Sequence, residues 1–341
     1  MELYAAIDLH SNNSILVVLD QDDHVILERR LKNDLERIRL ALAPHRESIR
    51  GIAVESTYNW YWLVDGLMNE GYQLHLVNTA AVKQYEGLKY SSDQHDARWL
   101  AHLLRLGILP EGYIYPKKER ALRALRDLAR KRSQLVRTRT TQILSIQNIL
   151  ERNLGTQFSG NDIKTWSTEE IKALPLLPEQ RLAVSANLAV MQCLDEQIKI
   201  VERAILVQAR LRPDFQGLLT VSGIGKILAL TIALETGDIG RFDRVGDFAS
   251  YSRCVNSVRL SNGKKKGAGN AKNGNKYLAW AMVEAANFAV RYDPTIKRFY
   301  QRKKTQGHAV VAIKAVAHKL ARACYHVMRE GEPFDVTRAF A

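Results

Sequence analysis

The chain has 341 residues, of which 46% are hydrophobic and 25% charged, a composition typical of folded globular domains that excludes a disordered or fibrous protein. Its 50 Lys and Arg residues outnumber 36 Asp and Glu residues, giving a formal net charge of +14, which favours a nucleic-acid partner over an anionic membrane surface. No apolar run has the roughly 20 residues of a membrane span, and no signal segment is recognisable. The three cysteines are far apart and form no CxxC pair, which excludes a disulfide framework and a cysteine-based zinc site. A cytoplasmic protein is therefore expected.

The charge is unevenly distributed along the chain. Residues 1–110 hold 11 basic and 15 acidic side chains, a net charge of −4, whereas the remaining residues have a net charge of +18. Proline positions and the charge change predict three domains, at 1–110, 111–212 and 213–341. A basic part that binds nucleic acid, joined to a part that needs carboxylates, would have this distribution.

The first domain is predicted to be α/β. Apolar runs separated by turn-forming residues indicate three strands, then a helix, a strand, a helix, a strand and a helix. The expected ranges are 3–9, 14–20, 24–30, 31–42, 51–55, 60–70, 72–77 and 92–106. This order is typical of the ribonuclease-H-like fold, although other α/β domains share the alternation.

Two long helices are predicted for the second domain, over 117–153 and 178–211. Apolar residues at helical spacing favour an antiparallel coiled-coil arm, with two helices packed on a globular core as the alternative. Residues 117–139 carry ten Lys or Arg and two acids. We interpret this run as a contact with nucleic-acid backbone rather than only a solvated helix face; the candidates are Arg123, Arg126, Arg130 and Lys131.

Four carboxylates occupy positions from which a metal site can be built. Asp8 and Glu55 follow the apolar residues of the first and fourth strands, which are neighbours in a ribonuclease-H-like sheet, and Asp93 and Asp96 share one face of a helix. Converging carboxylates require cations between them, and hard oxygen ligands suit Mg²⁺ or Mn²⁺ in phosphoryl transfer. The alternative is that each acid is a helix cap or an ion-pair partner.

The third domain is predicted to be mainly helical and contains two motifs suited to phosphate binding. Residues 218–226 resemble the hairpin of a helix-hairpin-helix motif, in which Gly223, Gly225 and Lys226 would face a phosphate. Residues 259–276 form a basic, glycine-rich loop that contains Ser261, either a turn residue or a nucleophile. Its candidate phosphate ligands are Lys264, Lys265, Lys266 and Lys272.

Taken together, these motifs resemble the IS110 family of insertion-sequence transposases, which includes site-specific DNA invertases of the Piv type. The matching pieces are Ile-Asp8, Val-Glu55-Ser-Thr, Asp93-Gln-His-Asp96-Ala-Arg, Ser222-Gly-Ile-Gly225, and Ser261 with its Lys/Gly loop. The resemblance implies a RuvC-like DEDD domain whose four metal-binding acids fall on Asp8, Glu55, Asp93 and Asp96, and a transposase domain whose serine nucleophile falls on Ser261. The chain departs from the family pattern at Tyr58, where Gly is common, and at Val255-Asn256, where Thr-Pro is common.

The resemblance also implies a mechanism and partners. A structured guide RNA, the bridge RNA, would pair with double-stranded donor and target DNA, and recombination would proceed through a serine–DNA phosphoester and a Holliday-junction-like intermediate. The protein would act in the bacterial cytoplasm, associated with the nucleoid, as a homo-oligomer, a dimer of dimers in which the RuvC-like site of one subunit meets the serine of another. Two alternatives stay open: a junction-resolving nuclease that uses metal-activated water, and a non-catalytic nucleic-acid-binding protein. A sugar-kinase-like relative is disfavoured because the sequence shows no nucleotide pocket.

Overall fold

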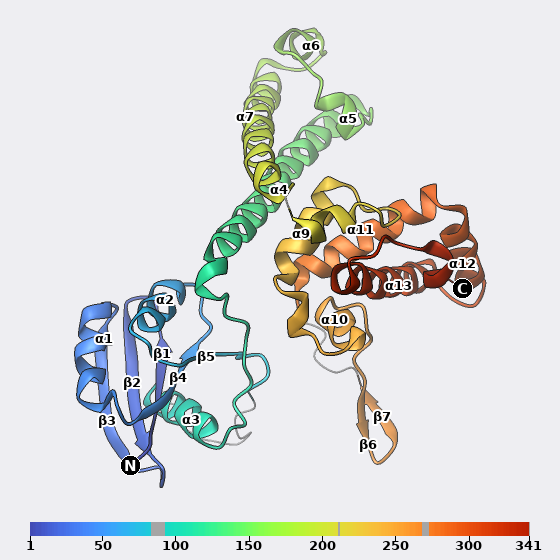
Figure 1. Ribbon diagram of the computed structural model, residues 1–341. Coiled ribbons are helices and arrows are strands. Elements are labelled where there is room, and N and C mark those ends of the chain that lie inside the picture. Colours follow the sequence, from blue (N-terminus) through green and yellow to red (C-terminus); the bar gives the residue numbers. More distant parts are fainter. Residues whose placement is uncertain (83–92, 211, 268–272, 341) are drawn as a thin grey trace. The chain divides into compact units, whose positions relative to one another are not determined.

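The computed structural model describes residues 1–82, 93–210, 212–267 and 273–340 (Figure 1). The chain divides into two compact units, Met1–Lys118 and Glu119–Ala341. None of the helices in these described ranges has both the length and the hydropathy of a membrane span.

The first unit is built on a five-stranded mixed sheet with the order β3-β2-β1-β4-β5. Its strands are β1 (Leu3–Leu9), β2 (Asn13–Asp20), β3 (Val25–Lys32), β4 (Ile49–Glu55) and β5 (Leu74–Val77). The first three strands are antiparallel neighbours, whereas β4 runs parallel to β1 and β5 runs parallel to β4. The predicted adjacency of the first and fourth strands is therefore confirmed.

Helices cover both faces of this sheet, which explains why most positions of β1, β2 and β4 are buried and why their middle residues are apolar. On one face, α1 (Leu35–Leu42) and α2 (Tyr61–Asn69) bury Ile38 and Leu63 against the strands. On the other face, α3 (Asp93–Arg105) packs Ala97 and Ala101 onto the sheet. The small side chains on α3 let its backbone approach β1 and β2 closely.

The second unit begins with two long antiparallel helices, α4 (Arg120–Leu154) and α7 (Pro178–Ala209), preceded by the short 3₁₀ helix η2 (Lys117–Glu119) (Figure 1). They pack along the predicted apolar stripes, and Ile146 of α4 and Met191 of α7 are fully buried in their shared core. Their connection contains α5 (Gly160–Ile163) and α6 (Thr168–Ala173), each begun by a serine capping box. The predicted helix pair is confirmed, and a domain boundary at residue 212 stays a prediction.

The remainder of the second unit is mostly helical around one apolar core. Its elements are α8 (Pro213–Leu218), α9 (Lys226–Thr236), the 3₁₀ helix η3 (Ile239–Arg241), α10 (Val245–Tyr251), the strands β6 (Arg259–Ser261) and β7 (Lys264–Gly267), α11 (Lys276–Tyr292), α12 (Pro294–Thr305), α13 (Ala309–Glu330) and α14 (Val336–Phe340). The turn before α9 packs closely against α11 at Gly223, where an added Cβ atom would lie 2.3 Å from the carbonyl oxygen of Ala285. A side chain at position 223 would therefore separate the turn before α9 from α11.

Candidate active site

Asp8 and Glu55 lie at the same edge of the sheet, near the carboxyl ends of β1 and β4. Ile7 is paired with Val54 in the parallel register, and Asp8 and Glu55 are the residues that directly follow this pair in their strands. Asp8 is buried, with 4% of its surface exposed, and its carboxyl group shares a hydrogen bond with that of Glu55. The strand order thus brings together two acids that are 47 positions apart in the sequence.

The helix α3 supplies the other two predicted acids from its first turn. The negative charge of Asp96 helps to raise the pKa of Glu55. Both residues line one pocket together with Thr79 and Leu100. Asp93 lies near Asp8, because ligand atoms of Asp8, His10 and Asp93 all lie within 4.8 Å of one another. The described part of the first unit therefore gathers all four predicted carboxylates at one sheet edge.

Two further residues of this cluster were not predicted from the sequence. His10 Nε2 lies 3.2 Å from Asp8 Oδ2 and 3.4 Å from Asp93 Oδ2, and Arg30 Nη2 lies 2.9 Å from the same Asp93 oxygen. The spacing of Asp8 and His10 was the available signal, because side chains two residues apart in an extended segment point to the same side. Arg30 reaches the cluster only through the β2–β3 pairing, which the local sequence does not show.

Crowding of carboxyl groups changes the titration of this site. Burial, the hydrogen bond with Asp8, and the negative charges of Asp8 and Asp96 raise the pKa of Glu55 to about 8. When no cation is bound, Glu55 is therefore protonated near neutral pH. Four carboxylates and one imidazole form a donor set that suits a hard divalent cation such as Mg²⁺ or Mn²⁺, which would offset their mutual repulsion.

We expect Mg²⁺ binding at this cluster to release a proton in a pH-dependent way. Below about pH 8 Glu55 is protonated, so the apparent Mg²⁺ affinity should rise about tenfold per pH unit up to that value and level off above it. Calorimetric titration in buffers of different ionisation enthalpy measures the release, with close to one proton per cation expected near pH 7 and almost none near pH 9. A Glu55→Gln variant should lose the slope, and a pH-independent affinity of the unmodified protein would contradict this assignment.

Ser261 lies at the end of a β-hairpin in the second unit. It closes β6 and pairs with Lys264 of β7, and the two residues between them, Asn262 and Gly263, both have positive φ, at 50° and 71°. This is the geometry of a tight two-residue hairpin turn, for which Asn-Gly is the preferred sequence. Ser261 and the lysines of β7 are exposed, whereas Lys272 lies outside the described residues.

The turn before α9 places its two glycines differently. Gly223, with φ of +85°, faces the backbone of α11, so its conformation and packing explain the glycine. Gly225 is exposed, is the N-cap residue of α9, and would have open space around an added Cβ atom, and Lys226 is the first residue of the helix. Ser222 anchors the turn through a 2.7 Å hydrogen bond from its hydroxyl to Asp293 Oδ2. Of the two predicted glycines, Gly225 is the one presented to solvent.

The four basic candidates on α4 occupy different environments. Arg123 is 7% exposed, and the side chain of Arg126 is 14% exposed. Arg130 binds the buried carboxylate of Glu235 in a bidentate ion pair, with nitrogen–oxygen distances of 2.6 and 2.7 Å. Lys131 is exposed, and its Nζ lies 3.1 Å from Gln134 Oε1. Lys131 is thus the member of this set whose side chain is exposed to solvent.

Comparisons with known proteins match both units. Residues 5–153 match the IS110 DEDD-type model described as a transposase, and residues 216–301 match the model described as the transposase IS116/IS110/IS902 family. A probable family 20 transposase of Pseudomonas aeruginosa is 26% identical over 89% of this chain and 90% of its own length. A putative transposase, y4qE, of Sinorhizobium fredii is 28% identical over 78% of this chain and 65% of its own length.

A third relative, the transposase for insertion sequence element IS1328 of Yersinia enterocolitica, is 28% identical over 41% of this chain and 43% of its own length. The two family models together span more than half of the chain; the first covers nearly all of the first compact unit and continues into the second, and the other lies within the second unit. The first of them covers all four clustered acids, which lie on β1, β4 and α3, and the second covers the Ser261 hairpin. The chain belongs to the IS110 family of insertion-sequence transposases.

Proposed function

We propose that this transposase is a DNA recombinase in which the carboxylate cluster of Asp8, Glu55, Asp93 and Asp96 holds a divalent cation and Ser261 is the nucleophile. The observation that carries the proposal is the convergence of four acids at one sheet edge, where burial and the neighbouring carboxyl groups of Asp8 and Asp96 raise the pKa of Glu55. The strand order β3-β2-β1-β4-β5, with three antiparallel strands followed by two parallel ones, supports a ribonuclease-H-like, RuvC-like domain.

In the proposed reaction, the Ser261 hydroxyl attacks a phosphodiester of the donor or target DNA. The bond between Oγ and phosphorus forms as the bond between phosphorus and the leaving deoxyribose oxygen breaks, and the hydroxyl proton is balanced by protonation of that oxygen. A Mg²⁺ ion, when bound, would supply positive charge to phosphate oxygens as negative charge develops on them. Asp8 and Glu55 would be ligands, Arg30 and His10 would orient Asp93, and Lys264 to Lys266 would neutralise the DNA backbone beside the serine.

The proposed partners are double-stranded donor and target DNA and a structured guide RNA, bound by a homo-oligomer. The excess of basic residues after position 110 supports binding of nucleic-acid backbones by the protein. Base pairing between the guide RNA and the DNA would then supply the sequence specificity. The helix-hairpin-helix-like turn at Gly225 and Lys226 supports one such backbone contact, because it exposes the N-terminus of α9. Sequencing of RNA that copurifies with the native protein tests the RNA component, and the absence of one discrete structured species would contradict it.

The reaction is tested by the products that the native complex forms with a donor DNA in Mg²⁺. We expect a protein–DNA adduct that survives denaturing detergent, is shortened by protease and is absent when EDTA replaces Mg²⁺. A junction-resolving nuclease would give cleaved DNA without an adduct. A non-catalytic binding protein would give salt-dependent binding with no requirement for a divalent cation.

A further inference from the structure

The outward face of α11 carries large aromatic side chains that the core does not use. Trp280 and Phe288 are each 41% exposed and Tyr292 is 71% exposed. The inward face of the same helix is lined with fully buried alanines, including Ala285 and Ala289, so the helix is packed on one side and aromatic on the other. An exposed row of aromatic residues on one helix face marks a binding surface, because such side chains are otherwise buried.

At the carboxyl end of α11, two aromatic rings are parallel and accompanied by cations. The rings of Phe288 and Tyr292 are stacked, with centroids 6.5 Å apart and an interplanar angle of 8°. The guanidinium of Arg291 lies 5.9 Å from the Phe288 centroid and 6.0 Å from the Tyr292 centroid. Both rings line a pocket with the turn before α9, including Gly225 and Lys226. Aromatic rings, the Lys226 side chain and the N-terminus of α9 therefore lie side by side here.

The amino end of α11 repeats this combination. Trp280 and Tyr277 line a pocket of about 290 Å³ with Arg137 of α4 and with Lys276. The Nζ of Lys276 lies 5.3 Å from the Tyr277 ring centroid, and the guanidinium of Arg130 lies 4.8 Å from it. The ion pair with Glu235 fixes the position of the Arg130 guanidinium beside the Tyr277 ring. The pocket is therefore formed between α4 and α11.

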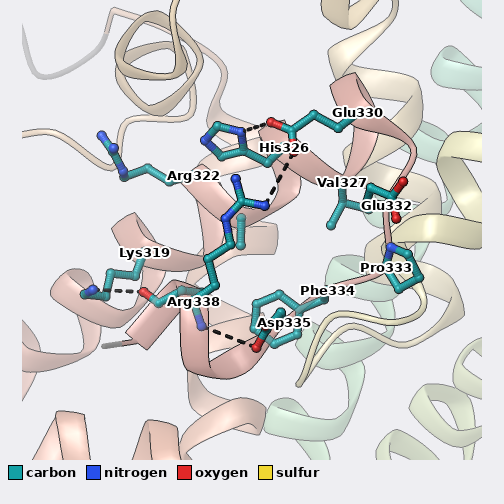
Figure 2. Close-up of a pocket in the computed structure, with 12 residues that line it drawn as sticks. Lys319, Arg322, His326, Val327, Glu330, Glu332, Pro333, Phe334, Asp335 and Arg338 are labelled. Carbon is teal, nitrogen blue, oxygen red and sulfur yellow. Dashed lines mark hydrogen bonds and ion pairs between the residues drawn. The ribbon is translucent and has the colours of Figure 1, made fainter.

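Another pocket, between α13 and α14, differs from the α11 face in the contacts of its basic side chains (Figure 2). Three of its basic side chains contact groups of the protein: His326 Nδ1 lies 2.6 Å from Glu330 Oε1 within α13, and two contacts join α13 to α14, with Arg338 Nη1 3.8 Å from Glu330 Oε2 and Lys319 Nζ donating to the Ala339 carbonyl oxygen at 2.8 Å. Those contacts fasten the C-terminal helix to α13. Among the described residues, the two pockets beside α11 are lined by aromatic and basic side chains and by no acid, and the one acid of α11, Glu284, lies a helical turn from both Trp280 and Phe288.

We propose that the exposed face of α11 binds an unpaired DNA strand. Bases stack on Trp280 at one end and on Phe288 and Tyr292 at the other, and phosphates lie against the neighbouring Lys and Arg side chains, namely Arg137, Lys226, Lys276 and Arg291. The combination of aromatic platforms and cations matches the two parts of a nucleotide, whereas a duplex hides its base faces. A second copy of this strongly basic region would bring like charges together. The proposal rests on the assignment of the chain as a DNA-acting transposase, whose substrate strands become unpaired during strand exchange.

The test compares binding of three labelled probes by fluorescence anisotropy in EDTA, so that catalysis plays no part. The probes are a 15-nucleotide oligo(dT), a 15-base-pair duplex and a 15-nucleotide oligo(U). Each of Trp280→Ala and Phe288→Ala is expected to weaken oligo(dT) binding about 5- to 150-fold, with duplex binding unchanged within about twofold. Trp280→Phe should restore most of the affinity because it keeps an aromatic face.

The matched control is Leu182→Ala, which removes a 71% exposed apolar side chain from α7 in the same unit and should leave all three probes unaffected. Thermal unfolding of each variant verifies that the fold is intact. Unchanged oligo(dT) binding would overturn the proposal, as would a loss confined to oligo(U), which would assign the face to RNA. A changed sedimentation coefficient with unchanged binding would instead assign it to self-association. Failure of the adduct assay with normal oligo(dT) binding would refute the serine chemistry and leave this proposal standing.

Discussion

Replacing Ser261 with Ala is expected to abolish the covalent protein–DNA adduct and to reduce recombination to background. The substitution removes only the Oγ atom from an exposed residue at the end of β6. The tight turn at Asn262 and Gly263, which sets the hairpin geometry, is untouched. Surface substitutions of this kind change stability by about 0.5 kcal/mol or less, so a loss of activity would report chemistry rather than unfolding.

The control for this variant is Ser257→Ala, which alters another exposed serine four positions earlier in the chain. It should form the adduct at the rate of the unmodified protein. Electrophoresis of labelled donor DNA in denaturing detergent measures both variants, and mass spectrometry of the protease-treated adduct should locate the DNA on the peptide that contains residue 261. An adduct that persists in Ser261→Ala would remove Ser261 from the mechanism and leave the hairpin as a DNA contact only.

The sheet was predictable because its strands carry their own signals. Apolar runs such as Ile52–Ala53–Val54 are buried on both faces, so their length and composition mark them without tertiary information. The boundary between β3 and α1 was predicted too early, with the helix starting at residue 31. Leu31 and Lys32 instead pair with Ser14 and Asn13 of β2, and Asp34 then caps α1 by accepting the Arg37 backbone N–H. Cross-strand pairing overrode local helical spacing.

The site was predictable where the chemistry is local and not where it depends on distant partners. Asp93 and Asp96 share a helix face, and Asp8 and Glu55 end neighbouring strands, so four acids were placed from spacing and strand order alone. A count of basic residues on α4 does not reveal that Arg130 faces Glu235, which is 105 positions away. The basic, glycine-rich composition of residues 259–276 predicts a loop, whereas Asn262-Gly263 forms a hairpin turn, for which this dipeptide is itself a strong signal.

Replacing Asp8 with Asn is expected to lower recombination about 10³-fold or more while raising thermal stability in the absence of divalent cations. Loss of one carboxylate removes a cation ligand, and metal assistance is worth several kcal/mol in phosphoryl transfer. The same change removes a buried negative charge that helps to raise the pKa of Glu55, so repulsion among the clustered carboxylates falls in the folded state. A structural ion-pair role would give the opposite sign, because the folded state would then lose a favourable interaction.

Thermal unfolding with and without Mg²⁺ separates these two effects. The unmodified protein should be stabilised by about 2.7 kcal/mol when Mg²⁺ is at about 100 times its dissociation constant, and Asp8→Asn should lose most of this gain. The control is Asp22→Asn, which removes the same charge from an exposed acid that also lies in a group of two acids and a histidine, with Asp20 and His24. Asp20 accepts hydrogen bonds from the backbone N–H groups of Asp22 and His24, so its carboxylate is already hydrogen-bonded within its own turn. Equal Mg²⁺ stabilisation of both variants would show that the cation binds elsewhere, and a lower unfolding midpoint of Asp8→Asn without Mg²⁺ would show that the cluster is structural.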